Sequence, residues 1–565
     1  MITYAETYSR WLGRASEASE LLAELRAIAN DPAAIEDRFY RELEFGTGGL
    51  RGALGAGSNR MNIYTVGKAT QGLAEYVLAA GGASAVAIAH DIRVNSRLFA
   101  ERAAAILAAN GIHVYIYPRL MPTPALSFAV RALKCCAGVM ITASHNPAQY
   151  NGYKVYGSDG CQITAKAAAA IQGEISRVDP FDGVPAADFE AYLADGRIEY
   201  ISDAIVERFL ACERAQSLLP ADVCRDVSIL YTPLNGAGIS CVPDCLKANG
   251  FEHIVIPDEQ RTPDGRFPTC PYPTPELHDA LKVGLAWAER TGSDLLLATD
   301  PDCDRVGAAV LHNSEYVCIS GNEMGALLLD YVCRMRAAQG KMPARPVAVK
   351  TIVTTPLAEK IADKYGVELR NVLTGFKYIG EQIGLLEAAG ETERYIFGFE
   401  ESCGYLSGSF VRDKDAVNAA LLICELFCWH RQRGKTLIDA LEEIYAELGY
   451  YGSRLLSFNF EGLAGFEKMR MLMAGLRENP PRTIADMPVM SKIDYLADDT
   501  GLPKSDVLRY LLPEGEVTVR PSGTEPKIKL YLSAHSASTA STRALVNRLA
   551  RALERWMDRE KRYCQ

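Results

Sequence analysis

The stretch ASAVAIAHDIRVNSRLFAERAAAILAANGIHVYIYP, residues 83–118, determines the expected fold of this chain. It opens with a short apolar run that predicts a buried strand, 83–91, and it closes with a second strand, 113–118. Between them, residues 97–111 carry apolar side chains at helical spacing, and Gly111 is placed to end that helix. Strand, helix and strand at this spacing form a βαβ unit, which predicts a mostly parallel sheet.

The same pattern continues along the chain, and only the last part differs. Amphipathic helices are predicted over 4–30 and 63–80, and further short strands over 227–233, 293–300, 346–353 and 393–400. Residues 515–534 instead alternate as two paired strands around a turn, and a helix over about 541–560 follows. Candidate domain boundaries lie in polar stretches with Gly and Pro at 178–205, 315–322 and 440–455, and the loop 478–505 belongs inside the last domain.

Composition narrows the classes of protein that the chain can belong to. Its 565 residues correspond to about three to five domains. The net charge of −10 argues against a nucleic-acid partner or an anionic membrane surface, since both attract clustered Lys and Arg. No apolar run approaches the roughly 18 residues of a membrane span. The N-terminus lacks the apolar segment of a secretory signal, and the fifteen cysteines are scattered, so we expect a cytoplasmic protein.

Three predicted strands end in polar residues that could bind a ligand or take part in catalysis. In open α/β sheets, ligands bind beyond the carboxyl ends of strands, so residues at these positions are candidates for a ligand-binding site. The first is TASHNP, in which Ser144 follows an apolar strand and fits either a turn or a phosphoryl-carrying nucleophile. The second is DPDCDR, in which Asp300, Asp302 and Asp304 alternate before Arg305. Three carboxylates this close repel one another, which favours a hard cation such as Mg²⁺ over an Asp-rich turn.

The third predicted strand of this kind ends in GFEES, where Glu400 and Ser402 fit a site for sugar hydroxyls or a solvated turn. Two further clusters combine polar or charged side chains with glycines. RPSGTEPKIK, 520–529, combines hydroxyls, exposed amides and cations in the manner of a phosphate-binding nest. FGTGGLRG, 45–52, reads as a flexible loop with a single cation, Arg51, and with no clear strand before it.

The motifs TASHNP, DPDCDR, GFEES and RPSGTEPK stand in the order seen in the α-D-phosphohexomutase superfamily, which the chain resembles from about residue 40 to 535. NGYKVY and VRDKDAV make it most similar to the phosphoglucomutase/phosphomannomutase branch, close to the phosphopentomutase-like enzymes. The resemblance implies an α/β fold of four domains around a central cleft. Their expected ranges are 1–205, 206–319, 320–445 and 446–565. The first three would share a mixed, mostly parallel βα sheet, and the fourth would be a smaller α+β domain.

The resemblance also implies the reaction and the roles of individual residues. A phosphoryl group would move reversibly between the 1- and 6-positions of a hexose phosphate, through a phosphoserine enzyme and a sugar 1,6-bisphosphate. The Mg²⁺ ligands would be Ser144, Asp300, Asp302 and Asp304. Catalysis would involve Ser144, Lys154 as general acid/base, His145 and Arg51. Substrate would be bound by Arg305, Thr374, Gly375, Glu400, Ser402, Lys414, Arg520, Ser522, Gly523, Thr524 and Lys529.

The chemistry of these residues agrees with that reaction. Moving a phosphoryl group within one sugar needs a residue that carries the group, a positive charge that offsets its negative charge, and a residue that transfers protons. Phosphomannomutase or phosphopentomutase activity stays open as the main activity. A metal-dependent phosphatase would use Ser144 and the aspartates of DPDCDR, but it would give no role to the predicted sugar-binding and phosphate-binding residues. A phosphosugar-binding protein without catalysis would not need Ser144 and three aspartates together. The expected partner is a small phosphosugar, and the oligomeric state is not indicated.

Overall fold

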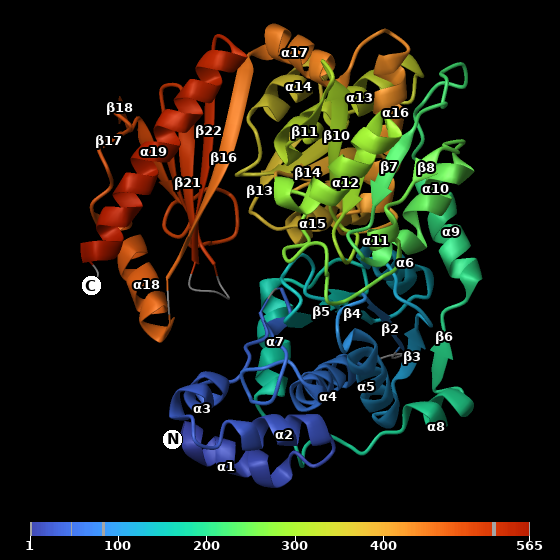
Figure 1. Cartoon of the computed structure of the whole chain (residues 1–565), viewed down its shortest axis with the longest axis vertical. Helices are drawn as coiled ribbons and strands as arrows, with labels where there is room; N and C mark the ends of the chain where they lie inside the picture. The colour runs from blue at the N-terminus through green and yellow to red at the C-terminus, as the bar shows by residue number, and fades with distance from the viewer. Residues whose placement is uncertain (1–2, 47, 82–84, 461, 523–526, 564–565) are drawn as a thin grey trace. The chain divides into compact units, whose positions relative to one another are not determined.

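The computed structural model of the chain describes every residue except 1–2, 47, 82–84, 461, 523–526 and 564–565 (Figure 1). It consists of two compact units. Unit 1 contains Met1–Ile319, Gly380–Tyr395 and Cys403–Trp429. Unit 2 contains Ser320–Ile379, Ile396–Ser402 and His430–Gln565.

Unit 1 begins with a six-stranded mixed sheet in the order β1-β5-β4-β2-β3-β6. Its strands are β1 (Leu50–Ala53), β2 (Ala85–His90), β3 (His113–Ile116), β4 (Ala137–Ile141), β5 (Tyr150–Gly157) and β6 (Ile198–Tyr200). β2 pairs in parallel with β3 and β4, whereas β5 is antiparallel to both β4 and β1. The predicted βαβ unit over 83–118 is therefore confirmed, with α5 (Ser96–Ala109) as its helix.

Helices cover both faces of this sheet. α4 (Ile63–Ala80) and α5 lie on one face and α6 (Thr123–Ala132) on the other (Figure 1). The side chain of Asn62 caps α4 by accepting hydrogen bonds from the backbone of Tyr64 and Thr65. Fully buried Val86, Ile88 and other apolar residues of the strands form the core with these helices. The remaining helices near this sheet are α7 (Ala165–Ile175), α8 (Phe189–Ala194) and α9 (Asp203–Arg214).

The N-terminal segment departs from the sequence prediction. The single helix expected over 4–30 is two helices, α1 (Tyr4–Arg14) and α2 (Ser19–Ala27), followed by α3 (Pro32–Phe39). The chain turns at Ala15–Ala18 so that Trp11 and Leu25 enter one buried cluster, and the Tyr8 hydroxyl donates to the carbonyl of Leu25 at 2.9 Å. Burying the apolar sides of two short helices against each other is favoured over exposing one long amphipathic helix.

The loop expected over 45–52 is also corrected, because Leu50–Ala53 form β1. This strand pairs with the free edge of β5, with Arg51 opposite Gly152. Its four residues are too short for a periodic signal, and the pairing partner lies about a hundred residues away in the sequence. Arg51 therefore projects from a strand rather than from a mobile loop.

The second sheet of unit 1 has the order β11-β10-β9-β7-β8. Its strands are β7 (Ile229–Thr232), β8 (Ile254–Val255), β9 (Leu295–Thr299), β10 (Val306–His312) and β11 (Glu315–Ile319). Its helices are α10 (Val242–Ala248), α11 (Asp258–Arg261) and α12 (His278–Thr291). The rest of unit 1 comprises the greater part of α15 (Phe376–Ala388), β15 (Gly404–Leu406) and most of α16 (Ala416–Arg431).

Unit 2 contains the strands β13-β12-β14 of the third sheet, in that order. They are β12 (Val347–Thr351), β13 (Glu368–Val372) and β14 (Tyr395–Glu400), and the helices are α13 (Gly321–Ala338), α14 (Leu357–Tyr365) and α17 (Leu437–Leu448). The orders β3-β2-β4, β8-β7-β9 and β13-β12-β14 are the same, with the first strand in the chain between the second and the third. The predicted shared topology is confirmed for these strands.

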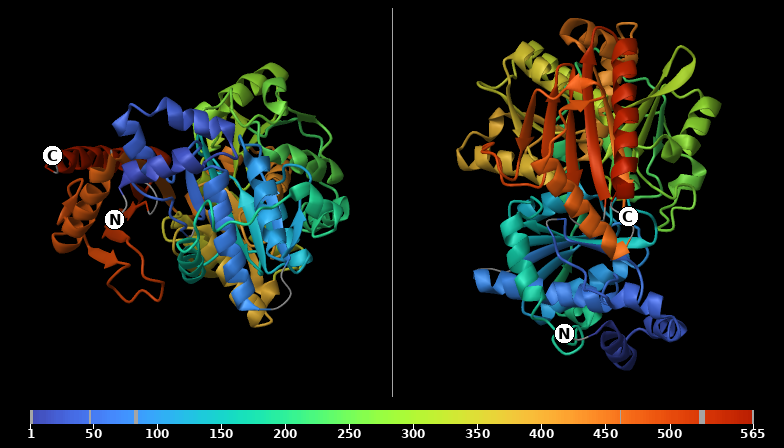
Figure 2. Two further views of the ribbon diagram at one scale, coloured as in Figure 1. Left: turned by 90° about the horizontal axis from the view of Figure 1, so that it is seen from below. Right: turned by 90° about the vertical axis from the view of Figure 1, so that its left-hand side faces the viewer.

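Unit 2 ends in an antiparallel sheet, as predicted, with the order β16-β22-β21-β20-β19. Its strands are β16 (Tyr450–Asn459), β19 (Ser491–Asp494), β20 (Leu508–Leu512), β21 (Gly515–Pro521) and β22 (Lys527–Ser536). Helix α19 (Thr539–Tyr563) lies across one face (Figure 2), and α18 (Gly462–Glu478) follows β16. The stretch 478–505, expected as a loop, contains β19 and the pair β17 (Thr483–Ile484) and β18 (Met487–Pro488). None of the helices in the described part of the chain is long and apolar enough to span a membrane.

Candidate active site

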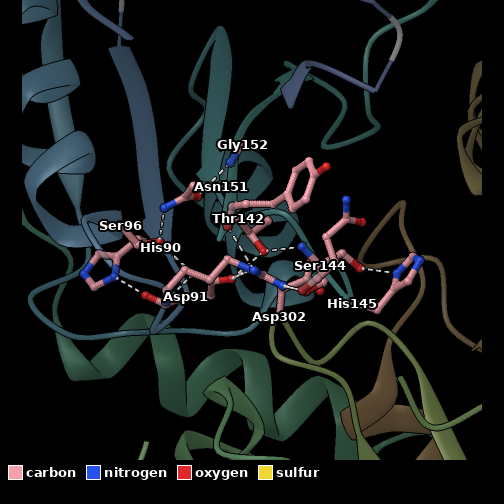
Figure 3. Close-up of polar contacts among 12 residues, drawn as sticks. His90, Asp91, Ser96, Thr142, Ser144, His145, Asn151, Gly152 and Asp302 are labelled. Atoms are coloured by element: carbon pink, nitrogen blue, oxygen red, sulfur yellow. Dashed lines mark hydrogen bonds and ion pairs between the residues drawn. The ribbon is translucent and has the colours of Figure 1, made fainter. Parts of the chain in front are cut away.

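Ser144 lies just beyond the carboxyl end of β4 and is almost fully buried. Its hydroxyl donates to Oδ2 of Asp300 at 2.9 Å. The same hydroxyl lies 3.2 Å from Nδ1 of His145 (Figure 3). Its backbone φ of +53° lies in the left-handed region that favours glycine. A nucleophile is thus presented at a strand end, with its oxygen directed at a carboxylate from a second sheet of unit 1.

The three aspartates follow β9, the strand that corresponds to β4 in the second sheet. All three are buried, and each offers an oxygen within 4.8 Å of the others. Oδ1 of Asp300 accepts from the backbone amides of Asp304 and Arg305 at 3.1 Å each, which closes the turn. Among the described residues, Oδ1 of Asp302 and Oδ1 of Asp304 have no hydrogen-bond partner. Converging carboxylate oxygens with spare lone pairs are a donor set that a hard divalent cation fits.

The negative charges of the three aspartates repel one another. Burial raises the pKa of Asp300 well above its usual value, and the neighbouring carboxylates of Asp302 and Asp304 raise it further. Burial acts in the same direction on Asp302, but the ammonium groups of Lys154 and Lys414 and a hydrogen bond with Asp300 together outweigh it and lower the pKa of that carboxyl. Burial also raises the pKa of Asp304. A cation at these oxygens would relieve this repulsion, so the electrostatics agree with the donor set.

Two lysines approach the aspartates from different parts of unit 1. Lys154 on β5 places Nζ 2.8 Å from Oδ2 of Asp302 and 3.9 Å from Oδ2 of Asp304. Lys414 places Nζ 2.9 Å from the same oxygen of Asp304 and 3.1 Å from Oδ1 of Asp413. The side chains of both lysines are at least 88% buried, at 8% and 12% exposure. Strand β5 is antiparallel to β4, which brings Lys154 to the same edge of the sheet as Ser144.

Two arginines lie near this group. Arg51 donates from Nη1 to Oδ1 of Asn146, two residues after Ser144, at 3.0 Å. Arg305 is ion-paired with Glu276, and its Nε lies 3.8 Å from Oδ1 of Asp304. The structure therefore brings nine predicted site residues of unit 1 to one place: Arg51, Ser144, His145, Lys154, Asp300, Asp302, Asp304, Arg305 and Lys414.

The predicted sugar-binding residues lie in unit 2. Glu400 is the last residue of β14, the strand that corresponds to β4 and β9, and its Oε1 accepts from the backbone amide of Gly375 at 2.9 Å. Gly375, with a φ of +122°, and Thr374 belong to the segment that follows β13. Ser402 lies in the turn after Glu400 and is half-buried. The two predicted sugar-binding segments are thus in contact through Glu400.

The predicted phosphate-binding residues lie on β21 and β22. Arg520 and Lys529 are directly opposite each other across this antiparallel pair. The backbone amide of Ser522 donates to the carbonyl of Lys527 at 2.7 Å. Gly523 and Thr524 lie outside the described residues. Within unit 2, burial and the charge of Glu401 raise the pKa of Tyr531, and the charge of Arg520 acts in the opposite direction. This buried tyrosine is therefore influenced by charges from both the predicted sugar-binding and the predicted phosphate-binding segments.

Residues near Ser144 that sequence reasoning passed over also contribute to its surroundings. Asp91 and Arg93 follow β2, and both are buried. Arg93 donates to the carbonyls of Ser144 and Asn146, and Asp91 accepts from the Thr142 hydroxyl at 2.6 Å. A signal existed in the sequence, because HDIR ends a predicted strand in the same sheet.

Known proteins match this chain along most of its length. Models of the phosphoglucomutase/phosphomannomutase family match four segments in order: alpha/beta/alpha domain I over 42–181, domain II over 207–313, domain III over 320–448 and the C-terminal domain over 473–552. A phosphoglucomutase of Staphylococcus aureus is 36% identical over 541 residues, covering 93% of this chain and 94% of the relative.

Solved structures resemble the fold. A phosphoglucomutase/phosphomannomutase family protein of Burkholderia thailandensis has a TM-score of 0.66 at 19% identity, covering 92% of this chain and 97% of its own. An N-acetylphosphoglucosamine mutase of Aspergillus fumigatus, solved with GlcNAc-6P and magnesium, has a TM-score of 0.51 at 15% identity, covering 95% of this chain and 99% of its own. Four matched domains and 36% identity across nearly the full length place the chain in the phosphoglucomutase/phosphomannomutase family, as an isomerase of the phosphoglucomutase type.

Proposed function

We propose that this chain interconverts glucose 1-phosphate and glucose 6-phosphate, with Ser144 as the phosphoryl carrier and a sugar 1,6-bisphosphate as intermediate. The observation that carries this proposal is the 2.9 Å contact between the Ser144 hydroxyl and Oδ2 of Asp300. It joins a strand-end nucleophile to a group of buried carboxylates that could hold a cation. The 36% identity to a phosphoglucomutase supports glucose as the sugar.

We infer that the cation is Mg²⁺ and that Ser144, Asp300, Asp302 and Asp304 hold it. Among the described residues, Oδ1 of Asp302 and Oδ1 of Asp304 accept no hydrogen bond, which supports this choice because Mg²⁺ prefers hard oxygen donors. The magnesium of the A. fumigatus relative gives further support. When bound, such an ion offsets the negative charge of a transferring phosphoryl group.

The covalent chemistry is a balanced exchange at Ser144. In the first half-reaction, the bond between phosphorus and Oγ breaks and Oγ takes up a proton, while a new bond forms to the sugar 6-hydroxyl and that hydroxyl loses its proton. In the second half-reaction, Oγ loses its proton and takes back the phosphoryl group from position 1, and the sugar oxygen that is released gains a proton. We assign the proton transfers at the sugar oxygens to Lys154, whose Nζ lies in the same buried cluster. His145 and Arg51 flank the loop and would stabilise its charge.

Separate grips would hold the sugar. We assign the sugar hydroxyls to Glu400 and Ser402 with Thr374 and Gly375, and the non-transferring phosphate to Arg520, Ser522, Gly523, Thr524 and Lys529, with Lys414 and Arg305 also binding substrate. The bond from Gly375 to Glu400 supports the first assignment, because one ligand could then contact both segments. Arg520 and Lys529, two cations directly opposite each other on neighbouring strands, support the assignment of the phosphate-binding residues.

Sugar choice follows from the need to bind the bisphosphate in two orientations. A fixed grip works in both only if it contacts hydroxyls that exchange places when the sugar turns over, as the 3- and 4-hydroxyls do. The 2-hydroxyl, which distinguishes glucose from mannose, is then poorly recognised. We therefore propose turnover of both hexose 1-phosphates with glucose preferred.

The test is incubation of the protein with glucose 1-phosphate, Mg²⁺ and a trace of glucose 1,6-bisphosphate. Formation of glucose 6-phosphate supports the proposal. Release of inorganic phosphate instead would identify a phosphatase, and binding without turnover would identify a phosphosugar-binding protein. Mannose, glucosamine and pentose 1-phosphates assayed side by side would rank the sugars.

A further inference from the structure

Ser144 adopts a backbone conformation that must be held in place by its neighbours. Its φ of +53° is disfavoured for a residue with a side chain. Such conformations persist where surrounding contacts determine them, and they are frequent at functional sites. The question is which contacts hold the backbone of Ser144.

The backbone amide of Ser144 is held through Thr142. It donates to Oγ1 of Thr142 at 2.8 Å, and the Thr142 hydroxyl in turn donates to Oδ2 of Asp91 at 2.6 Å (Figure 3). The other oxygen of Asp91 accepts from the Ser96 hydroxyl at 2.7 Å and from the Arg93 amide at 2.8 Å. Asp91 is 1% exposed, so these hydrogen bonds are protected from competition by water.

The carbonyl of Ser144 is held by Arg93. From Nη2, Arg93 donates to the carbonyls of Ser144 and Asn146. From Nη1, it donates to the carbonyls of Pro147 at 2.9 Å and Tyr150 at 3.0 Å. One guanidinium therefore binds four carbonyls of the segment 144–150. Its side chain has no exposed surface.

Four of the five N–H donors of Arg93 are directed at this loop. A guanidinium has five N–H groups, and the four on Nη1 and Nη2 match the four carbonyls. Its Nε lies 3.3 Å from Oδ2 of Asp91 and makes no hydrogen bond among the described residues, and the group stacks on Phe267 at 5.0 Å from the ring centroid. Because this fifth N–H group is buried, Arg93 presents no donor to a substrate, which separates it from the predicted phosphate-binding arginines.

The sheet explains why this pair meets the loop. β2 and β4 are parallel neighbours, with His90 opposite Ile141, so the residues after each strand emerge side by side. The backbone amide of Asp91 donates to the carbonyl of Ile141 at 3.1 Å, which continues the pairing beyond the strands. The Asp91–Arg93 pair is therefore anchored to the sheet while it holds the loop.

We propose that Asp91 and Arg93 are positioning residues that keep Ser144 in its left-handed conformation, with its hydroxyl directed at the aspartates. This inference rests on the proposed role of Ser144 as the carrier. A lysine cannot reproduce it, because an ammonium presents three donors from a point and cannot bind four carbonyls in a planar fork. The charge alone would thus be insufficient.

The first test compares Arg93→Lys with wild type. We expect kcat to fall by about 100-fold, the order of loss that a displacement of about 1 Å produces, while KM for glucose 1-phosphate stays near wild type. Peptides spanning 142–150 should exchange amide hydrogen faster, and the rest of the chain should not. Arg394→Lys is the matched control, because Arg394 is a buried, ion-paired arginine of unit 1 outside this cluster.

A second pair of variants serves where Arg93→Lys fails to fold. Thr142→Val removes the hydroxyl with little change of volume and should lower kcat and accelerate exchange in 142–150. Thr142→Ser keeps the hydroxyl and should recover most of the lost kcat. The proposal would be overturned if the two Thr142 variants had equal activity. It would also be overturned if Arg93→Lys and Thr142→Val both showed wild-type exchange in 142–150, or if exchange rose across the whole chain.

The two proposals can fail separately. If wild-type protein neither isomerises glucose 1-phosphate nor takes up phosphate, the proposed function is wrong. The positioning role would still be supported by faster exchange confined to 142–150 in Arg93→Lys and Thr142→Val, because that measurement needs no substrate.

Discussion

The Nζ of Lys154 lies 2.8 Å from Oδ2 of Asp302, inside a cluster from which water is almost excluded. An ammonium held this way is a potential acid for the sugar oxygen that leaves the phosphoryl group. It also neutralises part of the charge of the aspartates. The same contact thus links the proposed proton transfer to the proposed cation site.

Lys154→Met keeps most of the length of the side chain and removes the proton. General acid–base groups contribute about 10²- to 10⁴-fold, so kcat should fall by that order with little change in KM. Steady-state kinetics with glucose 1-phosphate measures both. A change confined to KM would make Lys154 a binding residue.

Ser144→Ala removes the proposed carrier and should abolish mutase turnover. The melting temperature should stay near wild type, because the side chain contributes little packing at a strand end. Intact-mass measurement after treatment with glucose 1,6-bisphosphate should show one added phosphate, ~80 Da, on wild type alone. Wild type that stays unlabelled under these conditions contradicts the carrier role.

Removal of divalent metal should stop turnover, and added Mg²⁺ should restore it. Asp302→Asn should reduce turnover even in excess Mg²⁺, since it removes one charge from the donor set. Asp279→Asn, at an exposed position on α12, is the control and should behave as wild type. Full activity after exhaustive chelation would make the aspartates structural.

Arg520→Ala should raise KM for glucose 1-phosphate, because charge-assisted bonds from a guanidinium to a phosphate are lost. The phosphate content of Ser144 should not change. Arg470→Ala, an exposed arginine on α18 of the same unit, is the control. Unchanged affinity in Arg520→Ala would exclude this arginine from the phosphate grip.

A stability prediction concerns Glu387. Hydrogen bonds from Arg131, with the charge of Arg412, lower its pKa to about 2. A lowered carboxyl pKa contributes stability above the unfolded-state value of about 4.3, and this contribution is lost as pH falls toward 2. Since the side chain is 45% exposed, we expect only about 1 kcal/mol.

The measurement is the melting temperature of Glu387→Gln and wild type between pH 7 and pH 3. The variant should melt lower at pH 7, and the difference should shrink as pH falls through this range. A difference that is constant with pH would mean that the carboxylate charge of Glu387 does not contribute. The exposed pair of Arg470 and Glu467 provides a control through Glu467→Gln, which should have a smaller effect.

The chemistry at the ends of β4, β9 and β14 could be predicted because each strand carries its own local signal. Ser144, Asp300 and Glu400 each follow or end an apolar run, and the three strands occupy the same place in their sheets. Local patterns therefore located the candidate site. The roles of these residues and the boundaries of the four domains stay predictions.

The role proposed for Arg93 could not be predicted in the same way. Its partners are backbone carbonyls of the segment 144–150, and a carbonyl leaves no trace in the sequence. The local sequence around Arg51 predicts a loop for a related reason, since its strand forms by pairing with β5. The break in the helix expected over 4–30 likewise depends on the contact between Tyr8 and Leu25. In each case a tertiary contact overrides the local preference of the sequence.

The left-handed φ of Ser144 also bears on which hydroxyl amino acid can occupy this position during evolution. Threonine offers the same nucleophilic oxygen, yet its branched Cβ makes a positive φ a strong outlier. The mildest chemical replacement is thus sterically among the most unfavourable, and serine suits this position for its backbone conformation as much as for its oxygen. Natural variation at position 144 should accordingly exclude threonine.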